Sequence, residues 1–364
     1  MITVSTTTAT VVIVNDTRPS TTTTAPAGCP ASPCVTITLT NQGTSTIESG
    51  SQVAIDVDWA SYASVLAPNL QNVRFLDSGG APIPAWLESC DGSESSCGTS
   101  SDVSLVWVKL DGAIAPGGSG TVFLAFAPTS VDEFSPSGDW GESPMLSPTY
   151  AEFDNGARVF NFYDDFAGTS LSGQWVNGTA DNPVTVDDGL TVGPSPTDND
   201  ANAISSVDSF GAGVVDFYGV IAATGASSGD FTYGGVGLAT PQSVQAGCCY
   251  FDNSALIGEA TGTYGLMTGA SDGLDGGAGT IVAGLTFGTN STYSIVVPSS
   301  SPSSIAAQVD YGQTISSSVG MPTLPQPISF FDQGNTGISI GPIHWIRERA
   351  YVDPDALTQE TSAF

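Results

Sequence analysis

The chain has 364 residues, which is too long for one ordinary hydrophobic core and fits two domains or a few. Its net charge of −30 comes from 6 lysines and arginines set against 36 aspartates and glutamates. No basic patch is available to neutralise phosphates, so we exclude nucleic acid as a partner and disfavour anionic membranes. Gly and Pro number 43 and 23, a profile typical of many short strands joined by turns, and we predict an all-β protein.

The shortage of cations also suggests an acidic habitat. At about pH 2 to 4 many carboxylates would be protonated and the self-repulsion of the chain would largely vanish. A halophilic host is the alternative, although such proteins gain acidic residues as well as lose lysines. Stability measured from about pH 2 to 8 separates these hypotheses.

The N-terminal segment 2–14, ITVSTTTATVVIV, is β-branched almost throughout and predicts a strand. Residues 15–28 follow as a Thr/Pro-rich linker, so residues 1–28 form a strand plus linker. Such a strand can add to the exposed sheet edge of a neighbouring copy, or it can be the first strand of the adjoining domain. The apolar residues that would carry assembly are Ile2, Val4, Val11, Val12, Ile13 and Val14.

The same segment lacks the charged start and compact apolar region of a signal peptide. No apolar run reaches the about 18 residues that a membrane-spanning helix needs, so we expect no membrane insertion. Export would then follow removal of a leader or use a signal outside this sequence.

Two cysteine pairs lie in segments typical of loops, CPASPC and CDGSESSCG. We predict local disulfides Cys29–Cys34 and Cys90–Cys97, which imply an oxidising, extracellular compartment. Three sequons predict surface glycosylation, at Asn15, Asn177 and Asn290.

Residues 29–128 show the alternation of half-buried antiparallel strands. Val35, Ile37 and Leu39 alternate with threonines, and Val106 and Val108 alternate with Leu105, Trp107 and Lys109. We predict a β-sandwich here, followed by a Pro/Ser-rich connecting segment at 129–150. Residues 151–364 are predicted to form a second β-sandwich, which ends in a polar tail, DALTQETSAF.

The segments NVRFLDSGGAPIPAWLES and VWVKLDGAIAPGGSGTVFLAFAP resemble the domain of unknown function DUF2341. The matching residues are Val73, Arg74, Phe75, Asp77, Trp86, Glu88, Trp107, Val108 and Lys109, whereas the closing FLAFAP departs from the usual YYGN. The later segments YAEFDNGARVFNFYDDFAGTSLSGQW and IHWIRERAYVDP are similar to the concanavalin A-like lectin/glucanase sandwich that follows this domain in archaeal surface proteins. His344 stands where that pattern more often has Asp. The resemblance implies two jelly-roll-like antiparallel β-sandwiches.

A glucanase-type fold raises the question of a glycoside hydrolase. Retaining glycosidases need two carboxylates about 5 to 5.5 Å apart, and glucanases of this superfamily place them on one strand as Glu-x-Asp-x-x-Glu or a near variant. The one Glu-x-Asp here is Glu152-Phe153-Asp154, which has no second Glu after it and precedes the predicted sandwich. The single histidine, His344, fits a place at a sheet surface better than a catalytic triad. We therefore predict no catalytic residues.

Asp164 and Asp165 in NFYDDFAGTSLSGQWV are candidate calcium ligands. Neighbouring side chains on a strand point to opposite faces, so turn capping or pairing with an arginine of the last strand is the alternative. Phe162, Phe166 and Trp175 of this stretch are predicted core residues. Looser calcium candidates are Asp187, Asp188, Asp198 and Asp200.

The stretch AGCCYFDN contains adjacent cysteines. A Cys248–Cys249 bond would form a strained ring, since neighbouring Cα atoms lie about 3.8 Å apart. With Tyr250 and Phe251 this ring would offer an apolar platform for a sugar. Two separate thiols, or a link to another chain, are the alternatives.

The last strand is predicted to place Ile343, Trp345, Arg347, Arg349 and Tyr351 on one face. In so acidic a chain Arg347 and Arg349 must find carboxylates, either within the domain or on a neighbouring subunit.

Together these features favour a non-enzymatic extracellular surface protein, structural or adhesive, that assembles into a filament by donation of the N-terminal strand. Its partners would be copies of itself or other cell-surface proteins. A carbohydrate-binding module is the alternative, and a glycoside hydrolase comes third. We expect no cofactor other than a calcium ion.

Overall fold

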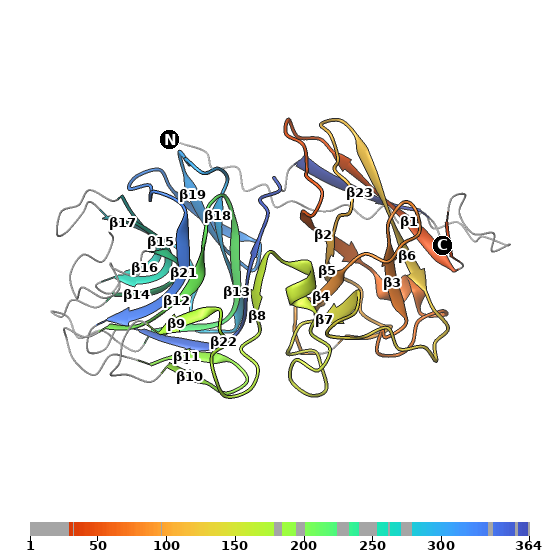
Figure 1. Ribbon diagram of the computed structural model, residues 1–364, viewed down its shortest axis with the longest axis horizontal. Coiled ribbons are helices and arrows are strands. Elements are labelled where there is room, and N and C mark those ends of the chain that lie inside the picture. The colour runs from red at the N-terminus through yellow and green to blue at the C-terminus, as the bar shows by residue number, and fades with distance from the viewer. Residues whose placement is uncertain are drawn as a thin grey trace. The chain divides into compact units, whose positions relative to one another are not determined.

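The computed structural model describes residues 29–31, 33–95, 97–177, 184–193, 201–223, 233–239, 253–260, 263–270, 279–333, 338–353 and 356–362. The chain forms two compact units (Figure 1). Residues up to Asn161 and residues from Val352 onward make the first unit, and Phe162–Tyr351 make the second. The second unit is therefore inserted into the first. Among the described helices, none is long and apolar enough to cross a membrane.

The first unit is a sandwich of two four-stranded sheets, with strand orders β23-β1-β6-β3 and β2-β5-β4-β7. The pairing is antiparallel except between β4 and β7, which run parallel. Its elements are β1 (Cys34–Asn41), β2 (Gln52–Val57), the 3-10 helix η1 (Trp59–Tyr62), β3 (Val73–Leu76), β4 (Ala85–Cys90), β5 (Ser104–Lys109), β6 (Ser119–Phe126), β7 (Trp140–Glu142), α1 (Gly156–Val159) and β23 (Leu357–Thr361).

The core of the first unit follows the predicted alternation. Every second residue of β1, β2 and β5 is buried in one cluster between the two sheets, including Val35, Ile37, Leu39, Val106 and Val108. Burial of apolar area at about 25 cal/mol per Å² is the main stabilising term for such a sandwich. The alternation therefore fixes the register of these strands.

The segment predicted as an interdomain connection belongs to the first unit instead. It contains β7, whose Trp140 is 2% exposed and packs against Phe75 and Phe134. The Trp140 indole N–H donates to the Leu70 carbonyl at 3.0 Å. Its Pro/Ser-rich composition concealed a strand that is short but anchored by a large aromatic side chain.

The predicted polar tail is also different in the structure. Residues 357–361 form β23, which pairs antiparallel with β1 from Ile37↔Thr361 to Asn41↔Leu357. Leu357 packs against the first core, while Thr358 and Glu360 are exposed. The tail prediction was wrong because an edge strand with one half-buried face carries little hydrophobic signal.

The second unit is a sandwich of an eight-stranded and a seven-stranded sheet. The orders are β10-β11-β22-β13-β18-β19-β20, with β8 also paired to β22, and β17-β16-β15-β14-β21-β12-β9. Its strands are β8 (Phe162–Asp164), β9 (Trp175–Asn177), β10 (Val184–Val186), β11 (Leu190–Val192), β12 (Ala201–Phe210), β13 (Gly213–Ala223), β14 (Tyr233–Ala239), β15 (Ser254–Ala260), β16 (Thr263–Gly269), β17 (Gly279–Ala283), β18 (Ser291–Val297), β19 (Ile305–Val309), β20 (Gln313–Ser317), β21 (Gln326–Gln333) and β22 (Ile338–Arg349).

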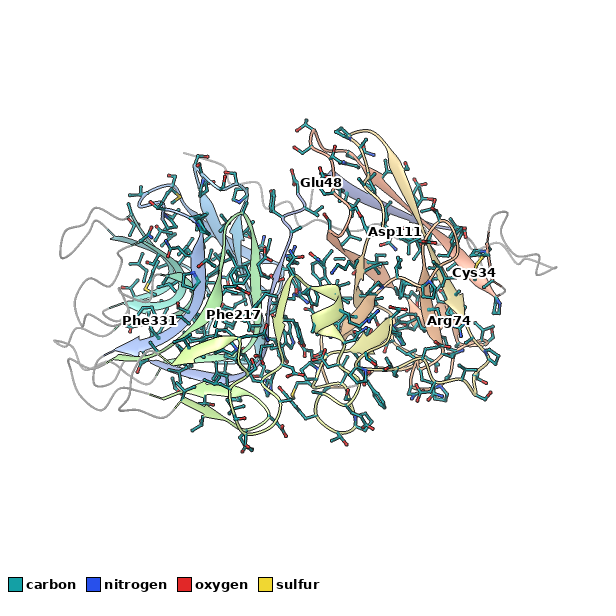
Figure 2. The ribbon with its side chains drawn as sticks, viewed as in Figure 1. Cys34, Glu48, Arg74, Asp111, Phe217 and Phe331 are labelled. Carbon is teal, nitrogen blue, oxygen red and sulfur yellow. A yellow bond between two sulfur atoms is a disulfide. The ribbon has the colours of Figure 1, made fainter. Side chains whose placement is uncertain are left out.

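One core joins the two sheets of the second unit. It contains Phe217 of β13, labelled in Figure 2, as well as the predicted core residues Phe162, Phe166 and Trp175. Trp175 packs edge-on against Phe162, with ring centroids 5.5 Å apart. The prediction for these three aromatic residues is confirmed, and with both units built from antiparallel strands the all-β sandwich class is confirmed as well.

The face predicted for the last strand is interrupted by a bulge. Tyr218 pairs with Trp345 and Gly219 pairs with Ile343, so His344 is the extra residue. Ile343 and Ile346 consequently both enter the core, while Trp345 and Arg347 lie on the opposite face. Strict alternation cannot anticipate an inserted residue, and the predicted face was wrong at Ile343.

Candidate functional site

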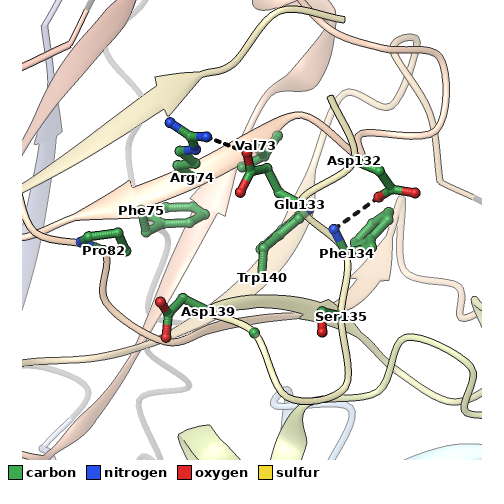
Figure 3. Close-up of a pocket in the computed structure, with 11 residues that line it drawn as sticks. Val73, Arg74, Phe75, Pro82, Asp132, Glu133, Phe134, Ser135, Asp139 and Trp140 are labelled. Carbon is green, nitrogen blue, oxygen red and sulfur yellow. Dashed lines mark hydrogen bonds and ion pairs between the residues drawn. The ribbon is translucent and has the colours of Figure 1, made fainter. Parts of the chain in front are cut away.

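The first unit carries a surface groove of about 300 Å³ between β3, the residues before β7 and the start of β7 (Figure 3). Aromatic side chains form its floor and polar side chains form its rim. The complete lining is Val73, Arg74, Phe75, Pro82, Asp132, Glu133, Phe134, Ser135, Gly138, Asp139 and Trp140. The groove is thus a recess in the side of the sandwich, next to two edge strands.

The floor of the groove is an aromatic stack that belongs to the core. Phe134 stacks on Trp140 with ring centroids 5.6 Å apart, and Phe75 packs against Trp140 at 5.7 Å. All three residues are buried, with Phe134 the most exposed at 7%. A ligand would therefore meet little exposed ring surface and mainly the polar rim.

The rim is held by ion pairs. Arg74 bonds Glu133, and the Arg158 guanidinium lies 2.7 Å from the Asp139 carboxylate. Asp132 accepts a hydrogen bond from the Phe134 backbone N–H at 3.0 Å. These exposed pairs contribute little to stability, and they fix the directions of the rim groups.

A buried carboxylate, Glu142 of β7, was missed by the sequence analysis. Burial raises the pKa of Glu142 to about 7, and repulsion from Asp132 and Glu152 acts in the same direction, whereas a Ser147 hydrogen bond opposes it. Glu142 was not recognisable in the sequence because its segment was assigned to a linker.

The Glu152-Phe153-Asp154 segment has a structural role in the first unit. Asp154 is 8% exposed and accepts hydrogen bonds from the Trp86 indole N–H at 2.8 Å and the Gly156 N–H at 2.9 Å. Both bonds orient its carboxylate into the protein. A substrate-facing general acid would need the opposite orientation.

Asp164 is the last residue of β8 and Asp165 follows it directly, and their carboxylates accept hydrogen bonds from different groups. Asp164 accepts from the Phe166 N–H, the Ser172 hydroxyl and the Trp175 indole at 2.8, 2.6 and 2.8 Å. Asp165 accepts from the Ala167 N–H at 3.0 Å. These hydrogen bonds match the alternative in which the aspartates cap a turn. Within the described ranges no group of three or more His, Cys, Asp or Glu side chains is placed to hold a metal ion.

The looser calcium candidates follow the same pattern where they are described. Asp188 accepts from the Gly168 N–H at 3.1 Å, and the Asp187 N–H donates to the Gly189 carbonyl at 3.0 Å. Asp198 and Asp200 lie outside the described residues.

Arg347 and Arg349 share one carboxylate within the second unit. Asp216 of β13 accepts from the Nε atoms of Arg347 and Arg349 at 2.9 and 2.7 Å. Burial alone would raise the pKa of Asp216, but the two guanidiniums outweigh it and lower that pKa. Arg347 also donates to the Tyr311 hydroxyl at 2.6 Å and lies 4.6 Å from the Trp345 ring centre. The structure thus shows pairing inside the domain.

His344 is more buried than a sheet-surface residue, at 8% exposed. Burial lowers its pKa, and a hydrogen bond with the Asp188 backbone acts against this. Its ring lies 6.0 Å from that of Tyr218. The prediction of a surface position fails because the bulge turns this residue away from regular alternation.

The sheets of the second unit contain buried single carboxylates. Glu259 of β15 and Asp332 of β21 both pair in register with Gly234 of β14, and both are fully buried. Each lies two positions from a core residue of its strand, Ile257 or Phe330, and therefore points to the same face, toward the core. No described strand of this unit carries two carboxylates.

The opposite face of the seven-stranded sheet carries both apolar and hydroxyl side chains, and Ser205 hydrogen-bonds Ser329 there at 2.8 Å. Ala203, Leu256, Met267 and Phe331 form a small buried cluster there; Phe331 is labelled in Figure 2. The predicted sugar platform, Cys248, Cys249, Tyr250 and Phe251, lies outside the described residues.

The two predicted local disulfides are present, with Cys29 bonded to Cys34 and Cys90 to Cys97. Asn290 of the third sequon is exposed before β18. Asn177 ends β9, although its side chain lies outside the description, as do Asn15 and the assembly residues Ile2, Val4, Val11, Val12, Ile13 and Val14.

Two edge strands of the first unit are covered by their own chain. On β3 the Val73 N–H donates to the Leu70 carbonyl, and the Phe75 carbonyl accepts from the Ile83 N–H. On β7 the Trp140 carbonyl accepts from the Ser135 N–H. The Glu142 N–H of the same strand donates to the Phe153 carbonyl. Pairing of another strand to either edge would require breaking these bonds.

Comparison with known proteins adds little beyond the fold. No family model matches this chain, and no curated protein matches it. Among solved structures, the Bacillus licheniformis β-glucanase is 14% identical over 52% of this chain and 98% of its own, with a TM-score of 0.33. The Crh5 transglycosylase in complex with NAG is 16% identical over 54% of this chain and 86% of its own, with a TM-score of 0.36. The Emp47p carbohydrate recognition domain is 11% identical over 52% of this chain and 94% of its own, with a TM-score of 0.36. Similarity at this level does not transfer an activity to this chain.

Proposed function

We propose that this protein is a non-enzymatic extracellular surface protein, structural or adhesive, whose copies assemble by donating the β-branched segment 2–14 to a neighbour. The observation that carries the proposal is β23. The first sandwich already accepts an edge strand delivered from the far end of the chain, where Thr36 bonds Ser362 across 326 positions. A sandwich completed in this way can be extended by a strand from another chain through backbone bonds of the same kind.

The roles of the carboxylates support a non-enzymatic protein. Asp154 and Asp164 bind tryptophan indoles, and Asp216 binds two arginines. Each carboxylate is thus committed to holding local structure. The two disulfides support an oxidising extracellular location.

Deletion of residues 1–20 tests assembly. We expect the full chain to form polymers that electron microscopy and light scattering detect, and the deleted chain to remain monomeric. Val11→Asp with Ile13→Asp should act as the deletion does, because residues two apart share a face of any extended strand and the two charges would burden one face of the donated segment. Thr7→Ser is the matched control and should polymerise. An unchanged oligomeric state after the deletion would remove strand donation from the proposal.

Carbohydrate binding is the second candidate, and the groove of the first unit favours it. Its volume of about 300 Å³ and its rim of Arg74, Asp132, Ser135 and Asp139 offer donors and acceptors to a sugar unit. A glycan array with calcium and with EDTA tests this. We expect a signal that Asp139→Ala weakens and Asp208→Asn, in the other unit, leaves unchanged. An array without any signal would contradict it.

A further inference from the structure

We propose that the outer edge of β23 is the acceptor for residues 2–14 of a second copy of this chain. This inference rests on the proposed function, because it names the surface on which the donated strand lies.

Among the described strands, only β1 pairs with β23, so one side of the β23 backbone is without a strand partner within the described ranges. The Ser362 N–H donates to the Thr36 carbonyl and the Gln42 N–H to the Ala356 carbonyl, so the even-numbered residues 356 to 362 face β1. In an antiparallel pair, the backbone N–H and C=O groups of every second residue point toward the partner strand, and those of the residues in between point away from it. The N–H and C=O groups of Leu357, Gln359 and Thr361 therefore point out of the sheet, as the position of β23 at the end of the strand order requires.

The remaining edges of the first unit are less suitable. Those of β3 and β7 are covered by residues 70, 83, 135 and 153, as described above. The fourth edge belongs to β2, where the Gln359 amide donates to the Asp56 carbonyl at 3.2 Å. An incoming strand would have to displace this bond from β2, whereas the outward backbone of β23 can be paired directly.

The edge of β23 also lacks the usual protection. Natural edge strands are often protected from pairing with other chains by Pro, by charged side chains, above all Lys, or by a bulge. The sequence LTQET has no Pro, Lys or bulge, its single charge is Glu360, and its register with β1 is regular over all five pairs. A regular backbone without proline or a bulge leaves this edge able to pair with a further strand.

The linker gives the donor strand a long reach. Cys29 is fixed by its disulfide to Cys34, the first residue of β1. Residues 15–28 extend over at most about 45 to 50 Å, at roughly 3.3 to 3.6 Å per residue. The donor strand itself is uncharged, so it brings no like charge next to the exposed Glu360 of β23.

Proline at an outward position is the sharpest test, because it removes an N–H from the free edge and leaves the bonds to β1 intact. Gln359→Pro in the full chain should be monomeric, and its donor strand should still enter wild-type copies. Added at one part in ten it should shorten wild-type polymers several-fold. Gln359→Ala, which loses the side-chain bond to Asp56 and keeps the N–H, should polymerise as the wild type does.

Ala54→Pro applies the same change to the outward edge of β2 and should leave polymers unchanged. Thr361→Pro is a second outward variant in case Gln359→Pro does not fold, as judged by its melting curve. If Gln359→Pro and Thr361→Pro polymerise normally, the acceptor inference is overturned while strand donation stands. If the wild-type chain with an intact segment 2–14 is monomeric, strand donation itself is overturned.

Discussion

Replacing Asp216 with Asn should destabilise the second unit strongly. The Asp216 carboxylate is fully buried, and it accepts bonds from the buried Arg347 and the nearly buried Arg349. The variant keeps the size of the side chain and removes its charge. It therefore leaves two guanidinium groups facing an uncharged amide inside the protein.

Breaking one partner of a buried ion pair costs about 3 to 5 kcal/mol. In a domain of this size each kcal/mol lowers the melting temperature by about 2 to 4 °C, so a fall of roughly 6 to 20 °C is expected at neutral pH. Differential scanning calorimetry measures it directly. Asp208→Asn, an exposed substitution on β12 of the same unit, is the matched control and should shift the free energy of unfolding by no more than about 0.5 kcal/mol.

The effect also has a defined pH dependence. The pKa of Asp216 is lowered in the folded protein from its usual 3.8, so the stabilising contribution is present above pH 3.8 and is lost as the pH falls through the folded value. The difference between wild type and variant should consequently shrink in strong acid. A variant that melts within about 2 °C of the wild type at pH 7 would refute the view that the ion pairs of Asp216 with Arg347 and Arg349 stabilise the second unit.

Three further changes test other carboxylates and the chain end. Since the pKa of Glu142 is raised from 4.5 to about 7, the folded first unit should lose up to roughly 3 kcal/mol of stability as the pH rises between these values, and Glu142→Gln should flatten this slope in urea titrations. Asp164→Ala should cost about 2 to 4 kcal/mol, while Asp165→Ala costs under about 1; a melting temperature that calcium raises and EDTA lowers would instead support a metal site. Deleting residues 357–364 should destabilise the first unit and expose β1; unchanged hydrogen exchange in β1 would contradict the pairing.

The fold class was predictable because side-chain alternation reports burial directly. Val35, Ile37 and Leu39 occupy the core of the first unit in the register that the sequence implies. The same holds for Phe162, Phe166 and Trp175, whose size and apolar character leave few alternatives to a core position. The local disulfides were likewise predictable, since each pair lies close in sequence.

The pairing of distant segments was not predictable. β23 has the composition of a surface tail, and only its hydrogen bonds with β1 make it a strand. The buried position of His344 could not be predicted either, because it results from a bulge that depends on the partner strand β13. The groove at Arg74 and Asp139 combines residues from separate elements, and no local pattern connects them. The predicted DUF2341 and concanavalin A-like relationships stay predictions.

The insertion of the second unit has a consequence for folding kinetics. β1 is synthesised early, yet its outer partner β23 follows only after the whole of Phe162–Tyr351. Contacts of such large sequence separation form slowly, because the intervening chain must close a long loop. Until then one edge of β1 is unpaired and prone to aggregation, and a folded second unit helps by bringing its two ends, and with them β23, back together. Completion of the first sandwich is therefore expected to be the last step in folding, and refolding experiments should show protection of β1 amides appearing after that of β13 and β22.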